Sequence, residues 1–371
     1  MATDTSPPEE STGPAPGPKS SGVQPRRAIR ILGSLALAAL SVCVALLIAE
    51  AGFALLLAHP TALRHLPRNV ASHVRAYYMS FDRDLVQTMP ECTQWDKELF
   101  YILQPGSCRF KAREFDVRLD INSLGVRDSE GALRAPEVVV LGDSYAMGWG
   151  VAQDETFAAS IRRQTGLRTL DAGVPSYGTA REMLLLNRVD SSQLRYLVIQ
   201  YSANDNGENL TFQAEHHHLD IGSRKLFARD VINVRKRQRY YLGSITWRIV
   251  RGIFRPEPST DLVLPPQEAA QLFIHAVMHG SRADLERVQI IAFEASPFEV
   301  MNGAFAEALA RECVRDKYPA FIRRMRVIDF HGRLRREHYF DLDDHLRASG
   351  HAIVGQAIAE IIRSQEAVRA R

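Results

Sequence analysis

The chain has 371 residues, enough for one large domain or two small ones, and 46% of them are hydrophobic, as is usual for a globular protein with a sizeable core. A formal net charge of +3 is small for this length and gives no indication of nucleic-acid binding. The sequence contains no Walker, dinucleotide or nucleic-acid-binding motif.

The first part of the chain combines a polar tail with an apolar run. Residues 1–28 begin rich in Pro, Ser, Gly and Glu, and such a segment cannot bury enough apolar surface to offset its ordering entropy, so we predict a disordered tail. The run from Ile31 to Ala49 carries no charge, and as a helix rising about 1.5 Å per residue it nearly matches a hydrocarbon core of about 30 Å. We predict a transmembrane helix over residues 29–58, with Glu50 near the far interface.

The charges beside this run predict its orientation. Arg26, Arg27 and Arg30 precede it, which favours a cytoplasmic tail and an inner-membrane, single-pass protein whose chain after residue 60 is periplasmic or extracellular. A cleaved signal peptide is the alternative, because Ala49-Glu50-Ala51 fits a small-x-small cleavage site. The apolar core exceeds the usual length of a signal peptide, so a retained anchor is favoured.

Among the four cysteines, one pair could form a disulfide. Cys92 and Cys108 flank a short segment with a Pro-Gly turn, and in an oxidising compartment they can pair across a hairpin. Cys43 lies inside the apolar run and is interpreted as a small apolar residue. Cys313 is expected to be buried on a helix.

Residues 61–130 are predicted to connect the membrane helix to the main domain. Residues 61–90 mix Arg, His and aromatic side chains without a clear period. Phe115–Ile121 alternate between apolar and polar side chains like a half-exposed strand, and a turn follows at Asn122–Arg127. We therefore expect a small β appendage over residues 91–130.

Residues 131–371 alternate between short apolar runs and helix-like stretches. This alternation predicts an α/β domain with a parallel sheet and helices on both faces, because parallel strands require right-handed crossovers. The strand candidates are Val138–Leu141, Thr169–Asp171, Tyr196–Tyr201, Val288–Phe293 and Arg326–Phe330; the helix candidates include Phe157–Arg163, Thr179–Val189, Gln267–Met278 and Ala348–Arg363.

The alternation fails at about residues 206–265, where we predict an insertion. Its basic stretch from Arg229 to Arg255 also contains large apolar residues, which fits either an amphipathic helix on anionic lipid or a cap over an active site. The insertion also contains His216-His217-His218. Adjacent histidines without a ligand from another element are a weak metal signal, so we predict no metal and no cofactor.

The stretch that carries the chemistry begins with the apolar run Val138–Leu141. Gly142 ends this expected strand, and Asp143-Ser144 occupies the turn before the next helix. A serine at the carboxyl end of a buried strand lies where an α/β sheet presents reactive groups, near backbone N–H groups that can stabilise an oxyanion. Gly-Asp-Ser by itself is more often only a turn.

Three further motifs follow in order along the chain. They are Asp171-Ala-Gly-Val-Pro-Ser-Tyr-Gly178, Ser202-Ala-Asn-Asp205 and Asp343-Asp-His-Leu-Arg-Ala-Ser-Gly-His351. With these motifs the chain, over roughly residues 115–365, resembles the SGNH hydrolases, also called the GDSL esterase/lipase family. The resemblance implies a flavodoxin-like sheet and ester hydrolysis through a Ser-His-Asp triad. An α/β-hydrolase is disfavoured, because its Gly-x-Ser-x-Gly motif would need a glycine at Ala146.

The resemblance assigns the triad to particular residues. Ser144 is the implied nucleophile, and a serine hydroxyl needs a neighbouring base, which the family supplies from the position of His345. The third group is Asp343, in an Asp-x-His variant of the commoner Asp-x-x-His spacing, because side chains two apart on an extended segment point the same way. Asp341 and Asp344 are interpreted as solvated loop carboxylates.

The resemblance also implies three oxyanion-hole donors. These are the backbone N–H of Ser144, the backbone N–H of Gly173 and the side-chain amide of Asn204. The chain departs from the family at Ser202, where relatives have glycine in Gly-x-Asn-Asp. It departs again at Arg347, where relatives usually have asparagine.

The sequence therefore predicts a membrane-anchored, outward-facing serine esterase. The expected partner besides the membrane is an acyl ester of a cell-envelope carbohydrate or lipid, and either water or a sugar hydroxyl could accept the acyl group. The alternative from another class is a non-catalytic glycan-binding or scaffold module on the same fold. The presence of Ser144, Asn204, Asp343 and His345 disfavours that alternative.

Overall fold

The computed structural model describes residues 13, 25–219, 221–255 and 262–370. The chain divides into two units, residues 1–49 and residues 50–371, each described by itself. Most of the predicted disordered tail lies outside the described residues.

The apolar run forms a single helix, α1 (Pro25–Ala58). Its part from Ile29 to Ala58 is long and apolar enough to cross a membrane, with a hydropathy of 2.7 in its most apolar window. None of the residues of that window is buried within the protein, so the apolar side chains lack the partners that a core helix would have. A signal sequence near the N-terminus would have the same properties.

The main domain is built on a five-stranded parallel sheet in the order β6-β5-β7-β8-β9. The strands are β5 (Val138–Leu141), β6 (Thr169–Asp171), β7 (Tyr196–Tyr201), β8 (Gln289–Glu294) and β9 (Arg326–Ile328). This is the flavodoxin-like order, in which the chain reverses its direction of travel across the sheet at β5. The predicted fold class is confirmed.

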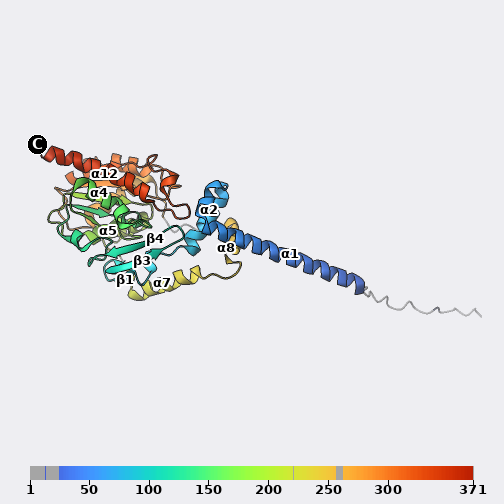
Figure 1. Ribbon diagram of the computed structural model, residues 1–371. Helices are drawn as coiled ribbons and strands as arrows, with labels where there is room; N and C mark the ends of the chain where they lie inside the picture. The colour runs from blue at the N-terminus through green and yellow to red at the C-terminus, as the bar shows by residue number, and fades with distance from the viewer. Residues whose placement is uncertain (1–12, 14–24, 220, 256–261, 371) are drawn as a thin grey trace, which may run out of the picture. The chain divides into compact units, whose positions relative to one another are not determined.

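Helices cover both faces of the sheet because β5 and β7 are apolar on both sides. Val139 and Leu141 pack with α5 (Thr179–Leu186), α9 (Pro266–His279) and α10 (Ala304–Cys313). Val138 and Val140 pack with α4 (Phe157–Thr165) and α12 (Ala348–Arg369), which lie side by side in Figure 1. The remaining short helices of the described chain are η1 (Pro60–His65), η2 (Tyr78–Asp82), η3 (Val86–Thr88), η4 (Glu130–Leu133), α3 (Ser144–Met147), η5 (Gln153–Glu155), α11 (Ala320–Arg323) and η6 (Arg336–His338).

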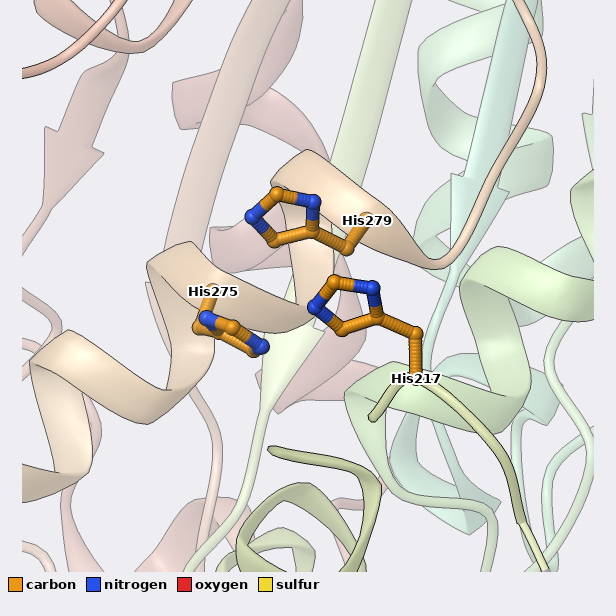
Figure 2. Close-up of side chains that lie close together, drawn as sticks. All are labelled: His217, His275 and His279. Atoms are coloured by element: carbon orange, nitrogen blue, oxygen red, sulfur yellow. The ribbon is translucent and has the colours of Figure 1, made fainter. Parts of the chain in front are cut away.

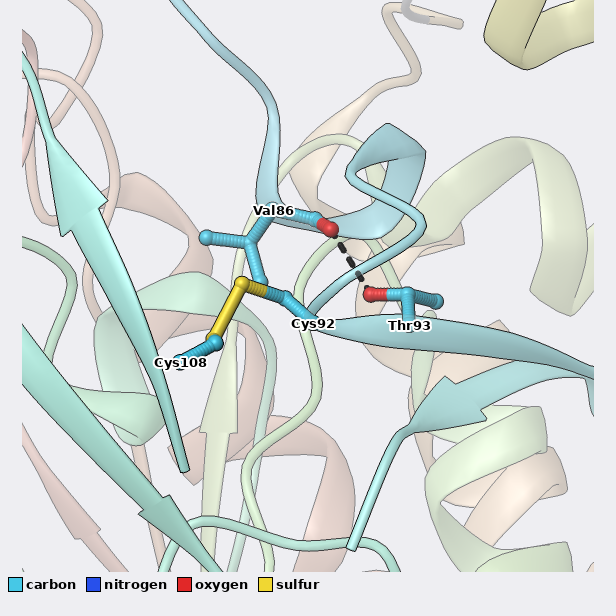
Figure 3. Close-up of a disulfide and its surroundings, with 4 residues drawn as sticks. All are labelled: Val86, Cys92, Thr93 and Cys108. Atoms are coloured by element: carbon cyan, nitrogen blue, oxygen red, sulfur yellow. Dashed lines mark hydrogen bonds between the residues drawn. A yellow bond between two sulfur atoms is a disulfide. The ribbon is translucent and has the colours of Figure 1, made fainter. Parts of the chain in front are cut away.

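The β appendage consists of two antiparallel pairs. β1 (Thr93–Asp96) pairs with β2 (Phe100–Leu103), and β3 (Gly106–Lys111) pairs with β4 (Asp116–Ile121). A disulfide between Cys92 and Cys108, whose Cα atoms are 5.5 Å apart, joins the two pairs (Figure 3). A bridge closing a loop of this length stabilises a domain by about 3 kcal/mol in the chain-entropy model.

Residues 61–90 are more ordered than their irregular sequence suggests. They contain α2 (Arg68–Tyr77), whose Val74 packs in an apolar cluster with Leu57 and Leu63. Ile245 of α8 (Ser244–Phe254) completes this cluster from a distant part of the chain. The cluster thus joins side chains of this segment to nearby Leu57 and to α8, far away in the sequence.

The insertion forms helices α6 (Asp205–Ala214), α7 (Arg224–Gln238) and α8, so its basic stretch is divided between two helices. α7 packs on β1 and β2, where Phe227 contacts Phe100 edge to face. α8 packs on α2. The Glu50 carboxylate accepts hydrogen bonds from backbone N–H groups at the start of α8, including that of Thr246 at 2.8 Å.

Candidate active site

The turn after β5 directs Ser144 away from the sheet. A Cβ atom on Gly142 would lie 2.5 Å from Gln200 Oε1 and 2.6 Å from the Ala146 side chain, so only glycine fits there. The Asp143 side chain accepts a hydrogen bond from the Tyr145 N–H at 2.9 Å and caps α3. Ser144 is therefore the first residue of α3, at the carboxyl end of the sheet.

Ser144, His345 and Asp343 form one hydrogen-bonded series. The Oγ atom of Ser144 lies 2.7 Å from Nε2 of His345. The Nδ1 atom of His345 lies 2.5 Å from Oδ1 of Asp343. With the proton on Nδ1, the imidazole donates to the carboxylate and leaves Nε2 free to accept the serine proton.

Two aromatic side chains hold the His345 ring. Trp149 stacks on it with ring centroids 4.8 Å apart and an interplanar angle of 14°, and Tyr145 contacts it with centroids also 4.8 Å apart. The ring is buried, and its orientation is set by packing as well as by its hydrogen bonds. Trp149 lies in the same stretch as Ser144, but its contact with His345 was not predicted.

Asp343 is fully buried and surrounded by donors. Its Oδ2 atom accepts hydrogen bonds from the Tyr78 hydroxyl at 3.2 Å and from Trp149 Nε1 at 3.3 Å. Burial by itself would raise the pKa of Asp343, but the positive charges of His345 and Arg83 hold it below its usual value. Asp343 therefore remains ionised and can stabilise an imidazolium.

The neighbours of Asp343 correct one prediction, because neither Asp341 nor Asp344 is a free, solvated carboxylate. The Asp341 side chain is only 3% exposed and pairs with Arg64 at 2.7 Å and Arg347 at 2.8 Å. Asp344 is 26% exposed and pairs with Arg83 at 3.0 Å. The local sequence shows the acidic residues of the loop but not the arginines that reach them from other elements.

Asp344 also lies close to the base. Its Oδ1 atom is 3.1 Å from His345 Nδ1, farther than the 2.5 Å of Asp343. Burial lowers the pKa of His345, but the two carboxylates outweigh burial and raise it above its ordinary value. Asp343 makes the shorter contact and is the more deeply buried of the two, as expected for the orienting group.

Glu114 holds the backbone of this loop. Its carboxylate accepts hydrogen bonds from the N–H groups of Asp341 and Leu342 at 2.7 Å and of Asp343 at 3.0 Å. Arg347 donates to the Tyr339 carbonyl at 2.7 Å. These contacts fix the approach of Asp343 to His345, and the sequence contained no signal for Glu114.

Arg83 connects the segment after α1 to the site. Its guanidinium lies 3.6 Å from Asp343, and its Cζ atom is 5.5 Å from the centre of the Trp149 ring. Tyr78 comes from the same segment and bonds Asp343. The segment between α1 and the β appendage thus forms one wall of the site.

The three expected oxyanion donors differ in their surroundings. Ser144 begins α3, and the first N–H groups of a helix have no acceptor within it. The Asn204 side chain follows β7 and acts to lower the pKa of the Asp143 carboxylate, which burial nevertheless raises to about 6. The Gly173 N–H instead donates to Asp171 Oδ1 at 3.1 Å, and a Cβ atom on Gly173 would lie 2.3 Å from the Met147 nitrogen. Close packing on α3 therefore requires glycine at position 173, and the role of its N–H as an oxyanion donor stays a prediction.

A cavity of about 1080 Å³ lies beside the loop that carries Asp343. Leu63, Leu66 and Met79 contribute apolar walls, and Arg68 and Arg75 contribute charge. Ser144 is not among its lining residues, so the cavity adjoins the triad on the side of the acid rather than that of the nucleophile.

Two groups of side chains among the described residues have the spacing of metal ligands. One is Asp343, Asp344 and His345, where Arg83 already supplies the positive charge between the carboxylates. The other is His217, His275 and His279, which the sequence analysis did not bring together.

No family model matches the chain, and no curated protein matches it. Solved structures do match in a structural comparison. One is a protein assigned to the lipolytic G-D-S-L family from Desulfitobacterium hafniense DCB-2, at 12% identity and a TM-score of 0.35, covering 60% of this chain and 98% of that one. Another is the lipase Lip_vut3 from a goat rumen metagenome, at 14% identity and a TM-score of 0.31, covering 60% of this chain and 94% of that one.

Proposed function

We propose that the protein is a serine esterase that cleaves or transfers acyl groups through Ser144, His345 and Asp343. The observation that carries this proposal is the continuous series of contacts from Ser144 Oγ to His345 Nε2 at 2.7 Å and from His345 Nδ1 to Asp343 at 2.5 Å. A nucleophile, a base and an orienting acid in this arrangement are the parts that acyl transfer requires.

In the first half-reaction Ser144 Oγ attacks the carbonyl carbon of the ester while its proton moves to His345 Nε2. The carbonyl oxygen becomes an oxyanion, stabilised by the Ser144 N–H and the Asn204 amide. The bond to the leaving alkoxide then breaks, and His345 returns the proton to that alkoxide. The products are a free alcohol and an acyl ester on Ser144.

In the second half-reaction His345 removes a proton from water or from a sugar hydroxyl, and the resulting oxygen nucleophile attacks the acyl-Ser144 carbonyl. When this intermediate breaks down, the bond between the acyl carbon and Ser144 Oγ breaks, His345 returns its proton to Oγ, and a carboxylic acid or a new ester is released. Asp343 remains ionised throughout and stabilises the imidazolium that forms in each half-reaction.

We further propose that α1 is retained as an anchor and that the catalytic domain faces the periplasm or the cell exterior. Arg30 and the arginines before it precede the apolar run, which favours a cytoplasmic tail. The Cys92–Cys108 disulfide fits an oxidising compartment. In that location the substrates within reach are acyl esters of cell-envelope carbohydrates or lipids.

Helix α8 fits a position at the membrane surface. Its inner face packs on α2 through Ile245 and Ile249, and its start is held by Glu50, the residue that ends the uncharged run. Its outer face and the preceding loop expose large apolar side chains: Tyr240, Tyr241, Leu242, Trp247, Val250, Ile253 and Phe254. An apolar face with interspersed arginines matches the interface of an anionic bilayer.

The catalytic part of the proposal is tested with the full chain in detergent, on acyl esters from two to sixteen carbons and on acetylated sugars. We expect hydrolysis that disappears in Ser144→Ala while the circular dichroism spectrum and melting temperature remain unchanged. If the folded Ser144→Ala protein kept full esterase activity, the catalytic proposal would be wrong and a binding module would take its place.

The topological part is tested with a reporter fused after Arg371, paired with the same reporter fused to a chain that lacks residues 1–58. We expect activity of a periplasm-dependent reporter only with the complete chain, and immunoblots of membrane fractions should show an uncleaved protein. Reporter activity in the cytoplasm would overturn the orientation.

A further inference from the structure

We propose that His217, His275 and His279 form a binding site for a divalent transition-metal ion, with Zn²⁺ as the best fit. This site is separate from the proposed esterase centre and does not depend on that activity. His217 lies in the turn after α6, whereas His275 and His279 lie on α9, which comes much later in the sequence. Each side chain offers a ring nitrogen within 4.8 Å of the others.

Two of the ligands are placed by helix geometry. His275 and His279 are four residues apart on α9, so their side chains project from successive turns on the same face. Their ring centroids are 4.6 Å apart. Histidines at this spacing on a helix are a recurring way of presenting two nitrogens to zinc.

The third ligand comes from the turn that follows α6. The N–H of His217 donates to the Phe212 carbonyl at 2.8 Å, and the backbone of His217 is left-handed with φ 69°. This turn brings the His217 ring against α9, at 4.2 Å from His279 and 4.9 Å from His275 between centroids. Figure 2 shows the three rings gathered in the space between the turn and α9.

The buried side chain of Phe212 packs against the histidine cluster. Phe212 of α6 contacts the rings of both His217 and His275, and it packs in an apolar cluster with Ala276 of α9. One side of the histidine cluster therefore packs on a buried aromatic ring, while the other side faces solvent. A water molecule can occupy the fourth position of a tetrahedral ion there.

One ring nitrogen of the cluster has no hydrogen-bond partner among the described residues. This atom is Nε2 of His275, and it is buried. Buried polar atoms normally have partners, so this orphaned nitrogen needs an explanation, and a metal ion provides one.

Small side-chain rotations would complete the geometry. Zinc–nitrogen bonds of about 2.0–2.1 Å in a tetrahedron place ligand nitrogens about 3.3 Å apart. The present nitrogens are within 4.8 Å of one another, and His217 and His279 are exposed enough to turn. Three neutral imidazoles favour Zn²⁺, Ni²⁺ or Cu²⁺ over Mg²⁺ or Ca²⁺, which prefer oxygen ligands.

The site would tie two helices together. His217 follows the carboxyl end of α6, and Asn204 stands immediately before the first residue of that helix. A helix of this length spans about 15 Å, so the ion would lie well away from Asn204. We infer that it clamps α6 to α9 and stabilises the platform that presents Asn204, without touching the ester.

The test is a Zn²⁺ titration of the untagged full chain in detergent, after chelator treatment, in competition with a chromophoric chelator. We expect one equivalent of Zn²⁺ per chain and at least a tenfold weaker affinity in each of His217→Ala, His275→Ala and His279→Ala. His216→Ala and His218→Ala are matched controls on the same turn, and their affinity should stay within twofold of the parent chain.

Two further measurements guard against misfolding and chance chelation. Zn²⁺ should raise the melting temperature of the parent chain but not that of His279→Ala, in which the replaced side chain is exposed and the metal-free melting temperature should match that of the parent. X-ray absorption of the zinc-loaded chain should show three imidazole nitrogens. Absence of stoichiometric binding, or an equal loss in the His216 and His218 controls, would overturn the site.

Discussion

Two histidine sites of the molecule, His345 and the cluster of His217, His275 and His279, have neighbours of opposite kinds. His345 lies between two carboxylates, which raise its pKa, whereas His275 lies among imidazoles and apolar side chains, and its pKa is lowered to about 4. The same side chain is therefore prepared to hold a proton in one place and to remain neutral in the other. The difference comes from burial and the surrounding charges: burial among other imidazoles favours the neutral form of His275, and the two carboxylates favour the protonated form of His345.

The largest expected effect concerns the nucleophile and base. Ser144→Ala and His345→Ala should each reduce kcat for ester hydrolysis by on the order of 10⁶-fold, and the double variant should lose little more, because the two residues act as one unit. The measurement is steady-state hydrolysis of a short-chain ester, with the exposed His216→Ala as control. Full activity of His345→Ala would show that His345 is not the base.

Asp343→Asn should be the next most severe change. An asparagine keeps the volume but favours the wrong imidazole tautomer, and by the precedent of serine proteases kcat falls about 10⁴-fold. Asp344→Asn is the matched control, because it lies farther from Nδ1 and is partly exposed. If Asp344→Asn proved the crippling change and Asp343→Asn harmless, the roles of the two carboxylates would be reversed.

Glu114→Gln tests whether the acidic neighbours of His345 need to be held in place. The carboxylate accepts three backbone hydrogen bonds from the loop of Asp343, and an amide can replace only part of them. A displacement of about 1 Å at the acid can cost about 10²-fold, so we expect kcat to fall by that order with little change in KM. A pure rise in KM would point instead to a role in substrate binding.

The pH dependence of ester hydrolysis tests whether the pKa of His345 is raised. His345 must be neutral to accept the Ser144 proton, so activity should rise with pH as it passes the raised pKa of His345, above the ordinary value of about 6.5. Asp344→Asn removes one of the two negative charges and should move this rise to lower pH by about one unit. A rise that stays in place would mean that Asp344 does not act on the base.

The smallest effect is spectroscopic. In NMR titrations of the full chain without metal, the ring signals of His345 should shift above the ordinary histidine range, and those of His275 only near pH 4. Each ring signal is assigned by its disappearance from the spectrum of His345→Gln or of His275→Gln. Titration of both rings near 6.5 would show that their surroundings do not distinguish them.

Much of the catalytic series could be predicted from the sequence because its determinants are local. A short apolar run ended by Gly142 predicts a strand and a turn that presents Ser144. The family resemblance pointed to Asp343 and His345, and their two-residue spacing on an extended segment is compatible with the contact that the structure shows. The five strands were likewise visible as runs of apolar residues, within about two residues of their observed ends.

Only the tertiary structure decided which distant side chains meet these local motifs. Tyr78, Arg83 and Glu114 reach the Asp343 loop from segments more than two hundred residues away, and nothing in their own neighbourhoods marks them. His217 meets His275 and His279 only because α6 packs on α9. Sequence periodicity reports which face of an element is apolar, whereas the identity of the residue that it faces is set by how the elements pack in space.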